Sequence, residues 1–395
     1  MNSSLCAVIV AILATTSFGF ILLGVGVTAA VIRRVPGLAR VAFSPPCPWP
    51  TLSVVMPACN EPDLGKALSA HLRTDYPNVE WIVVNDRSTD GTGEVAERMA
   101  SMDPRVRVIH VRTLPEGWLG KTHALQRGIE AATGEWVLFA DADVKATPDT
   151  LGRAIAYAEN RDLDFLTAIP RLEATTPLLD AMCLSAMRQV LAGCRIWAVS
   201  NPRSDAILGI GAFSLFRRTA YNSTPGMEWL RLEVADDLGL AYMLKSSGAR
   251  CGVVLGKDNL SLTFYESLRA LAGHMDKSAF AIVGRFSFFR ALNMSLLLLA
   301  ISLGPLLGLL LPSAPWVGPL SAVALVLGYG TAFVGARWMG SPLITTFLFP
   351  FADIALAGFT VYAAARGAKR GGILWRGTFY PTALLRSAQR VRFPI

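Results

Sequence analysis

The sequence has few charged residues and very few histidines. Asp, Glu, Lys and Arg make up 17% of its 395 residues, hydrophobic residues make up 52%, and there are 4 histidines. Scattered histidines, and 6 cysteines without a Cys-x-x-Cys pair, exclude a zinc site of the usual spacing. We therefore expect the cysteines to be reduced, small and mostly buried side chains.

The sequence also lacks any run in which basic and aromatic residues alternate, as binding to single-stranded nucleic acid would need. The net charge is +8, but much of the basic excess flanks apolar segments. Arg33 and Arg34 follow the first such segment, and the chain from Arg366 onward has 7 basic residues and no acidic one. This distribution is typical of the cytoplasmic side of a membrane protein, so we predict a membrane partner and no nucleic acid.

Three long apolar segments predict membrane-associated structure. Residues 5–32 carry no charge, and the basic pair follows this stretch, whereas a cleaved signal peptide has its basic residues first. The stretch can span about 30 Å of hydrocarbon, with its N-terminus outside. No acidic residue occurs between Asp276 and Asp353, and residues 291–311 and 316–338 predict two more membrane helices.

The last apolar segment, 343–365, is interrupted by Pro350 and has basic residues on both sides. Both flanks therefore favour the same, cytoplasmic face, and we predict a re-entrant or interfacial hairpin. The region just before the second membrane helix is predicted to be an amphipathic segment in the membrane interface, with Phe280, Phe286, Phe288, Phe289, Arg285 and Arg290. The predicted organisation is an anchor at 1–34, a Pro-rich linker at 35–50, a cytoplasmic globular domain at 51–272, the interfacial segment at 273–290, membrane helices with the hairpin at 291–365, and a basic cytoplasmic tail at 366–395.

Within the globular domain, short apolar runs alternate with helical patterns. This alternation predicts an α/β fold with a mostly parallel sheet flanked by helices. Ligands of such sheets bind at the carboxyl ends of the strands. The predicted strands are 52–56, 81–84, 106–111 and 136–140, and the predicted helices are 67–72, 92–100 and 121–132.

Acidic residues follow two of these strands. Asp86 comes directly after the second strand and is available for a nucleoside base or ribose, whereas Thr89 or Asp90 caps the next helix. Asp141 and Asp143 follow the fourth strand and could share Mg²⁺ or Mn²⁺, which favour carboxylate oxygens and bridge substrate phosphates.

Further along the chain, Asp236 and Asp237 precede an apolar helical run. They could cap that helix, or one of them could act as a general base.

These motifs together resemble family 2 glycosyltransferases over about residues 50–245. The resemblance lies in Pro57-Ala58-Cys59-Asn60-Glu61, in residues 84–92, in Asp141-Ala142-Asp143 and in Asp236-Asp237. Residues 118–122, 201–203 and 374–380 resemble hopene-associated glycosyltransferases, with ceramide and carotenoid glucosyltransferases as more distant relatives. The resemblance implies a GT-A nucleotide-diphospho-sugar transferase fold and inversion at the anomeric carbon.

The resemblance also implies roles for individual residues. Asp237 would be the base, with Asp236 as the alternative, and Asp143 would bind the metal. Lys121 would lie near the diphosphate, although a solvated lysine at a helix start is an equal alternative. The nucleotide-sugar would contact Pro57, Ala58, Asn60, Glu61, Asp86, Lys121 and Asp141; the acceptor would contact Gly209, Gly211, Ala212 and Phe213, unless these only pack a strand tightly against a turn.

The sequence departs from the family after the base. Ceramide glucosyltransferases and processive polysaccharide synthases carry Q-x-x-R-W or R-x-x-R-W there, but residues 273–280 contain no Arg-Trp pair. This absence disfavours a processive synthase and leaves the diphosphate without its expected cation, unless Lys277 or Arg285 serves.

The predicted function is transfer of a sugar from a nucleotide-diphospho-sugar to a hydroxyl of a hopanoid-, sphingolipid- or carotenoid-like lipid. The predicted location is the cell inner membrane, with several membrane passes and the catalytic domain in the cytoplasm. Two alternatives stay open: transfer to a polyprenyl phosphate, and a non-catalytic membrane scaffold derived from a transferase.

Overall fold

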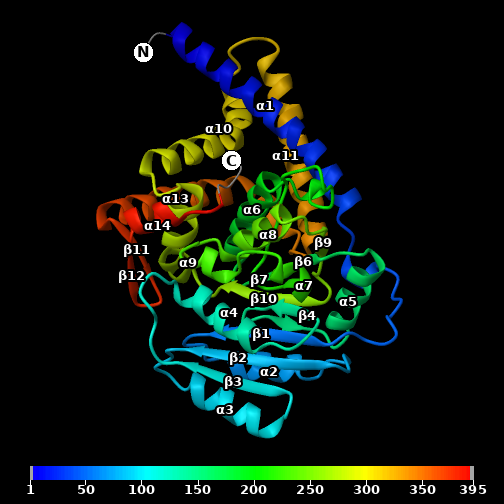
Figure 1. Ribbon diagram of the computed structural model, residues 1–395. Coiled ribbons are helices and arrows are strands. Elements are labelled where there is room, and N and C mark those ends of the chain that lie inside the picture. The colour runs from blue at the N-terminus through cyan, green and yellow to red at the C-terminus, as the bar shows by residue number, and fades with distance from the viewer. Residues whose placement is uncertain (1–2, 392–395) are drawn as a thin grey trace.

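The buried apolar runs of the globular domain form a seven-stranded sheet with the order β3-β2-β1-β4-β8-β6-β9. The computed structural model describes residues 3–391 (Figure 1). Strands β3, β2, β1 and β4 are parallel, and β8 runs antiparallel to both β4 and β6. The strands are β1 Leu52–Ala58, β2 Val79–Asp86, β3 Val106–Val111, β4 Trp136–Phe139, β6 Phe165–Ile169, β8 Ser214–Arg217 and β9 Cys251–Leu255.

Helices flank this sheet, and a smaller sheet with the order β5-β10-β7 lies beside it. Helix α4 packs on β1 and β2, while α2 and α3 pack together. The predicted α/β architecture is confirmed, and the predicted strands and helices match observed ones within a few residues. The helices are α2 Leu64–His71, α3 Thr92–Met102, α4 Gly120–Ala131, α5 Thr150–Asn160, α6 Pro177–Gly193, α7 Arg218–Asn222, α8 Asp236–Ser246, η1 Leu38–Arg40, η2 Ile196–Ala198 and η3 Met227–Leu230; the small sheet is β5 Lys145–Ala146, β7 Arg171–Ala174 and β10 Leu260–Tyr265.

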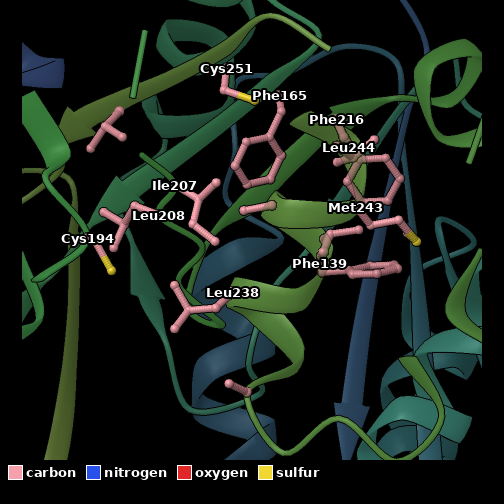
Figure 2. Close-up of a cluster of buried hydrophobic side chains, with 14 of the residues drawn as sticks. Phe139, Phe165, Cys194, Ile207, Leu208, Phe216, Leu238, Met243, Leu244 and Cys251 are labelled. Carbon is pink, nitrogen blue, oxygen red and sulfur yellow. The ribbon is translucent and has the colours of Figure 1, made fainter. Parts of the chain in front are cut away.

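Hydrophobic clusters cover both faces of the large sheet, because successive strand side chains point to opposite faces. In β4, Val137 and Phe139 enter one cluster while Trp136 and Leu138 enter the other. Figure 2 shows part of the first cluster, in which Leu238 of α8 lies in the same core as Phe139. The residue after Asp237 is thus fixed in the core, and α8 is held against the sheet.

The three apolar segments predicted to cross the membrane are helices: α1 Ser3–Arg34, α10 Phe288–Leu310 and α11 Val317–Met339. Within residues 3–391, these are the three helices long and apolar enough to span a bilayer. They project together from one end of the molecule (Figure 1). Small residues let them approach closely: a Cβ added to Gly304 of α10 would lie 2.1 Å from Ser17 Oγ of α1.

The hairpin predicted at 343–365 does not form, whereas an interfacial position of this segment stays a prediction. The short helix α12 Ile344–Phe347 is followed by one continuous helix, α13 Phe349–Arg370. Pro350 lies in the first turn of α13, where its missing N–H needs no partner, so it opens the helix instead of breaking it. Helix α13 lies across the base of the three long helices, beside the α/β domain (Figure 1). Arg337 at the end of α11 and the basic last turn of α13 can therefore share one side without the chain turning back.

The segment predicted to lie in the membrane interface has two of its phenylalanines inside the protein, and an interfacial role of the others stays a prediction. Residues 268–283 form α9 Leu268–Met275 and the π-helix η4 Asp276–Val283. Phe280 and Phe286 are buried in the protein interior, whereas Phe289 is 74% exposed. Phe280 is buried because Gly367 of α13 leaves room for its ring: an added Cβ there would lie 2.4 Å from it. The chain then ends in a hairpin, β11 Gly372–Trp375 and β12 Thr378–Pro381, and in α14 Thr382–Ala388.

Candidate active site

The loops after β1 and β2 are joined by hydrogen bonds. Pro57 and Ala58 are the last residues of β1, and Asn60 follows with a positive φ of 53°. The Asn60 side chain accepts from the Thr89 N–H at 2.8 Å, and the Glu61 N–H donates to Thr92 Oγ1 at 2.8 Å. The Asn60 side chain thus holds the loop after β2 against the loop after β1, and the two loops form one rim of the site.

Asp86 is the last residue of β2 and is buried. Arg87 donates to both of its carboxylate oxygens, at 2.7 and 3.0 Å. The backbone of Gly120 lies so close that an added Cβ would be 2.4 Å from Asp86 Oδ2. A role for Asp86 in binding the nucleoside remains a prediction, and it requires a ligand that shares this carboxylate with Arg87. Asp90 accepts from the Thr92 N–H at the start of α3, but the cap residue of this helix is Gly91 and not the predicted Thr89 or Asp90.

Lys121 lies in the first turn of α4, and its ammonium group is at the centre of the site. It is 2.6 Å from Asp141 Oδ1 and 3.3 Å from Asp236 Oδ2. Burial alone would lower the pKa of Lys121, but the carboxylates of Asp141, Asp236 and Asp237 outweigh burial and raise it. The alternative of a solvated lysine at a helix start is therefore wrong.

Asp143 lies two residues after Asp141, and other carboxylates are near its side chain. Burial, and then the charges of Asp141 and Glu61, raise the pKa of Asp143 to about 6. A carboxylate in this setting would be stabilised by a cation. In the part of the chain that the structure describes, no group of three or more His, Cys, Asp or Glu residues could hold a metal by itself.

Asp236 and Asp237 begin α8 and have different environments. Asp236 is 4% exposed and lies between Lys121 and Lys277, at 3.3 and 3.9 Å. Asp237 is half-buried; one oxygen accepts from the Gly211 N–H at 3.0 Å and the other from the Leu238 N–H at 2.8 Å. Burial, and then the charge of Asp236, raise the pKa of Asp237. A carboxylate oriented by two backbone amides, with a raised pKa, has the properties expected of a base.

The segment from 209 to 213 approaches the acidic residues through its glycines. A Cβ on Gly209 would lie 1.9 Å from the Asp237 carbonyl oxygen, and one on Gly211 would lie 2.7 Å from Asp141 Oδ2. Ala212 and Phe213 are buried in the hydrophobic core. The tight-packing alternative therefore fits Ala212 and Phe213, and only the glycines of this segment lie at the site.

Some of these residues line one pocket at the carboxyl ends of β1 and β4, whereas Asn60, Glu61, Asp86 and Asp143 are not part of its lining. Asp141 also donates its backbone N–H to the Gly211 carbonyl at 3.1 Å, which closes one wall. The pocket is lined by Pro57, Lys121, Leu125, Phe139, Ala140, Asp141, Gly211, Ser214, Met227, Asp236, Asp237 and Leu240.

The β11–β12 hairpin brings two residues to the site that strand-and-helix reasoning did not place there. Arg376 donates to Glu61 at 2.7 Å and to the carbonyl of Cys59. Trp375 of the hairpin has Lys277 of η4, one of the two predicted substitutes for the absent arginine besides Arg285, 4.1 Å from the centre of its ring. The available sequence signal was the motif at 374–380, but it carries no information on where in space it lies.

Glu233 was part of the same acidic motif as Asp236, yet it has a structural role. Its side chain is 2% exposed and accepts from the backbone N–H groups of Arg390 and Val391, at 2.6 and 3.0 Å. It therefore holds the segment after α14 against the loop that precedes α8.

Comparison with known proteins shows what part of the chain resembles. Residues 53–222 match the sequence model described as Glycosyl transferase family 2. An uncharacterized glycosyltransferase of Bacillus subtilis, EpsJ, is 34% identical over 118 residues, which is 30% of this chain and 33% of that protein. An uncharacterized Escherichia coli glycosyltransferase, YibD, is 36% identical over 114 residues, 29% of this chain and 32% of that protein. The chain thus spans about a third of the length of these relatives.

A solved structure has the same fold over most of the chain. A mannosyltransferase from Pyrobaculum calidifontis, in complex with GDP-Man and Mn²⁺, aligns with a TM-score of 0.55 and 20% identity. The alignment covers 92% of this chain and 99% of the mannosyltransferase. The large sheet and its flanking helices therefore form a GT-A fold.

Proposed function

Because residues 53–222 match the model of family 2 glycosyltransferases, we propose that this protein transfers a sugar from a nucleotide-diphospho-sugar to a membrane lipid hydroxyl. The observation that carries the proposal is Asp237, a carboxylate held by the amides of Gly211 and Leu238 in a pocket shared with Lys121. Asp237 takes the proton from the acceptor hydroxyl. The acceptor oxygen then forms a bond to the anomeric carbon while the bond from that carbon to the diphosphate breaks.

This single displacement inverts the anomeric configuration. The hydroxyl attacks from the face opposite the leaving diphosphate, so the base must lie on the acceptor side. Asp237 is half-buried, whereas Asp236 is more deeply buried and lies near two lysines. Asp237 is therefore the base, and Asp236 holds Lys121 in place.

The donor set fits Mg²⁺ or Mn²⁺. Asp143 lies next to other carboxylates and would bind the ion, with Asp141 close by. Such ions are commonly bound by one or two carboxylates together with substrate phosphates and water. When bound, the ion would neutralise charge on the leaving diphosphate. Lys121 adds a fixed positive charge beside Asp141.

The membrane topology supports a cytoplasmic active site and a lipid acceptor. Helix α1 ends with Arg33 and Arg34, α10 begins beside Arg290, and Arg337 lies in the last turn of α11. These basic ends lie toward the α/β domain, while the distant turn at 311–316 has no charge. Under the positive-inside rule, these basic ends support a cytoplasmic position for the domain. A small, largely apolar pocket is lined by Ala235 and Leu238, on either side of the acidic pair, and by Phe286, just before α10.

The test uses membranes that contain the full chain, radiolabelled UDP- and GDP-sugars, Mn²⁺ or Mg²⁺, and a lipid extract. We expect label in the organic phase. Asp237→Asn should lower the rate about 10³-fold, as loss of a general base does. Asp143→Ala should lower the rate to the level that the wild-type protein shows without metal, and added metal should no longer raise it. Asp258→Asn, an exposed acid elsewhere, is the matched control.

Different outcomes of this test have different meanings. Label that resists mild alkali and carries the inverted anomeric configuration by NMR supports a hydroxyl acceptor, whereas acid-labile phosphodiester product indicates a polyprenyl phosphate. No transfer from any donor by folded protein would contradict the proposal.

A further inference from the structure

The tip of the β11–β12 hairpin has a conformation that its sequence does not favour. Trp375 pairs with Thr378, so Arg376 and Gly377 alone form the turn, with φ values of 46° and 79°. A two-residue turn with both φ values positive is of type I′, and it favours asparagine and glycine. Arginine is uncommon in the left-handed region. An arginine at this position indicates a function for its side chain.

The base of the hairpin is fixed and its tip is accessible. Ile373 and Tyr380 are 0% and 6% exposed and pack in a cluster with Leu119 and Phe280. The Arg376 side chain, by contrast, is 48% exposed. The hairpin is therefore a rigid arm that presents a guanidinium group at its end.

That guanidinium group contacts the loop after β1, which forms one rim of the site. Its two terminal nitrogens donate to Glu61 and to the carbonyl of Cys59, the residues on either side of Asn60. The Arg376 side chain is 48% exposed and that of Glu61 is 21% exposed, so the ion pair is only partly buried and a phosphate can exchange for the Glu61 carboxylate.

We infer that Arg376 binds the diphosphate of the donor, exchanging the Glu61 carboxylate for phosphate oxygens. This inference rests on the proposed function and names a residue for it. The planar guanidinium group matches phosphate geometry with two parallel hydrogen bonds. It supplies the cation that the absent Arg-Trp motif would otherwise provide. Lys277 is less suited, because it is already held between Asp236 and the Trp375 ring.

The test is nucleotide binding by the full chain in nanodiscs, measured by isothermal titration calorimetry. UDP or GDP, whichever the wild-type protein binds, is compared with the corresponding monophosphate, with Mn²⁺ present. For Arg376→Gln we expect diphosphate binding to weaken at least about tenfold, as loss of a charge-assisted hydrogen bond implies, and monophosphate binding to stay within about twofold. Arg376→Lys should recover part of the loss. Arg98→Gln, which removes an exposed charge on α3, is the matched control.

The outcomes separate this inference from the proposed function. If the wild-type protein binds no nucleoside diphosphate, the proposed function fails and this inference fails with it. If the wild-type protein binds but Arg376→Gln leaves diphosphate affinity unchanged, only this inference is overturned. If diphosphate and monophosphate affinity fall equally while the melting temperature drops, Arg376 is a structural tether, and the inference is again overturned.

Discussion

A single methyl group at Gly209 should impair catalysis by displacing the base. Real Cβ atoms essentially never come within 3.0 Å of another heavy atom, yet a Cβ here would lie 1.9 Å from the Asp237 carbonyl oxygen and 2.4 Å from its carbon. The atoms that it meets are backbone, so rotating a side chain cannot relieve the clash. The start of α8 must move by roughly 1 Å, and a displacement of about 1 Å at a reacting group costs about 100-fold in rate.

For Gly209→Ala we therefore expect kcat to fall about 100-fold while the KM for the donor stays within about threefold. Overpacking should cost about 2 kcal/mol, which lowers Tm by about 6 °C in a domain of this size. The assay is lipid glycosylation at 25 °C together with thermal unfolding. Gly358→Ala is the control, because no atom lies within 4 Å of its added Cβ. A Gly209→Ala variant with normal kcat would refute the conclusion that this contact positions Asp237.

Two other substitutions test the buried charges. Lys121→Met leaves Asp141 and Asp236 without their shared cation, so we expect about 3 kcal/mol of destabilisation in thermal unfolding and weaker donor binding in titration. Lys121→Arg should restore most of the stability and of the binding. An unchanged Tm in Lys121→Met would contradict the conclusion that Lys121 neutralises these two carboxylates. His71 is buried with its Nε2 2.8 Å from the Val144 carbonyl, and burial lowers its pKa to about 4 from 6.5. Because its folded pKa lies below the unfolded one, the native state is fully stable above pH 6.5 and loses about 3 kcal/mol as pH falls from 6.5 to 4. Thermal unfolding between pH 7.5 and 4 should show this loss in the wild-type protein and a smaller slope in His71→Gln; identical slopes would show that another group is responsible.

The sequence predicts the elements whose burial is determined locally. The run Val106–Val111 is a strand with those same bounds, because apolar residues there are followed at once by turn residues. The order of the sheet beyond β4 was not predictable in this way. Strand β8 lies between β4 and β6 and runs antiparallel to both, and this arrangement depends on packing between segments far apart in the chain.

In the candidate site, too, some features follow from local sequence and others depend on distant contacts. The acidic residues at strand ends follow from the general rule that ligands bind there, and Asp86, Asp141 and Asp237 do lie at that edge. Pro350 was misjudged because proline breaks a helix interior but is favoured in a first turn, and only the position of the helix start distinguishes the two cases. The contact between Glu61 and Arg376 spans 315 positions in the chain, and no local pattern reveals it.

That separation has a consequence for biogenesis. The ribosome delivers the chain from the N-terminus, so the loop with Glu61 leaves the exit tunnel long before the hairpin that carries Arg376. Between them come α10 and α11, two of the three helices that are long and apolar enough to span a bilayer. A nascent chain would therefore lack the guanidinium group beside Glu61. Donor binding through Arg376, as inferred above, would begin only after the C-terminal hairpin has been synthesised.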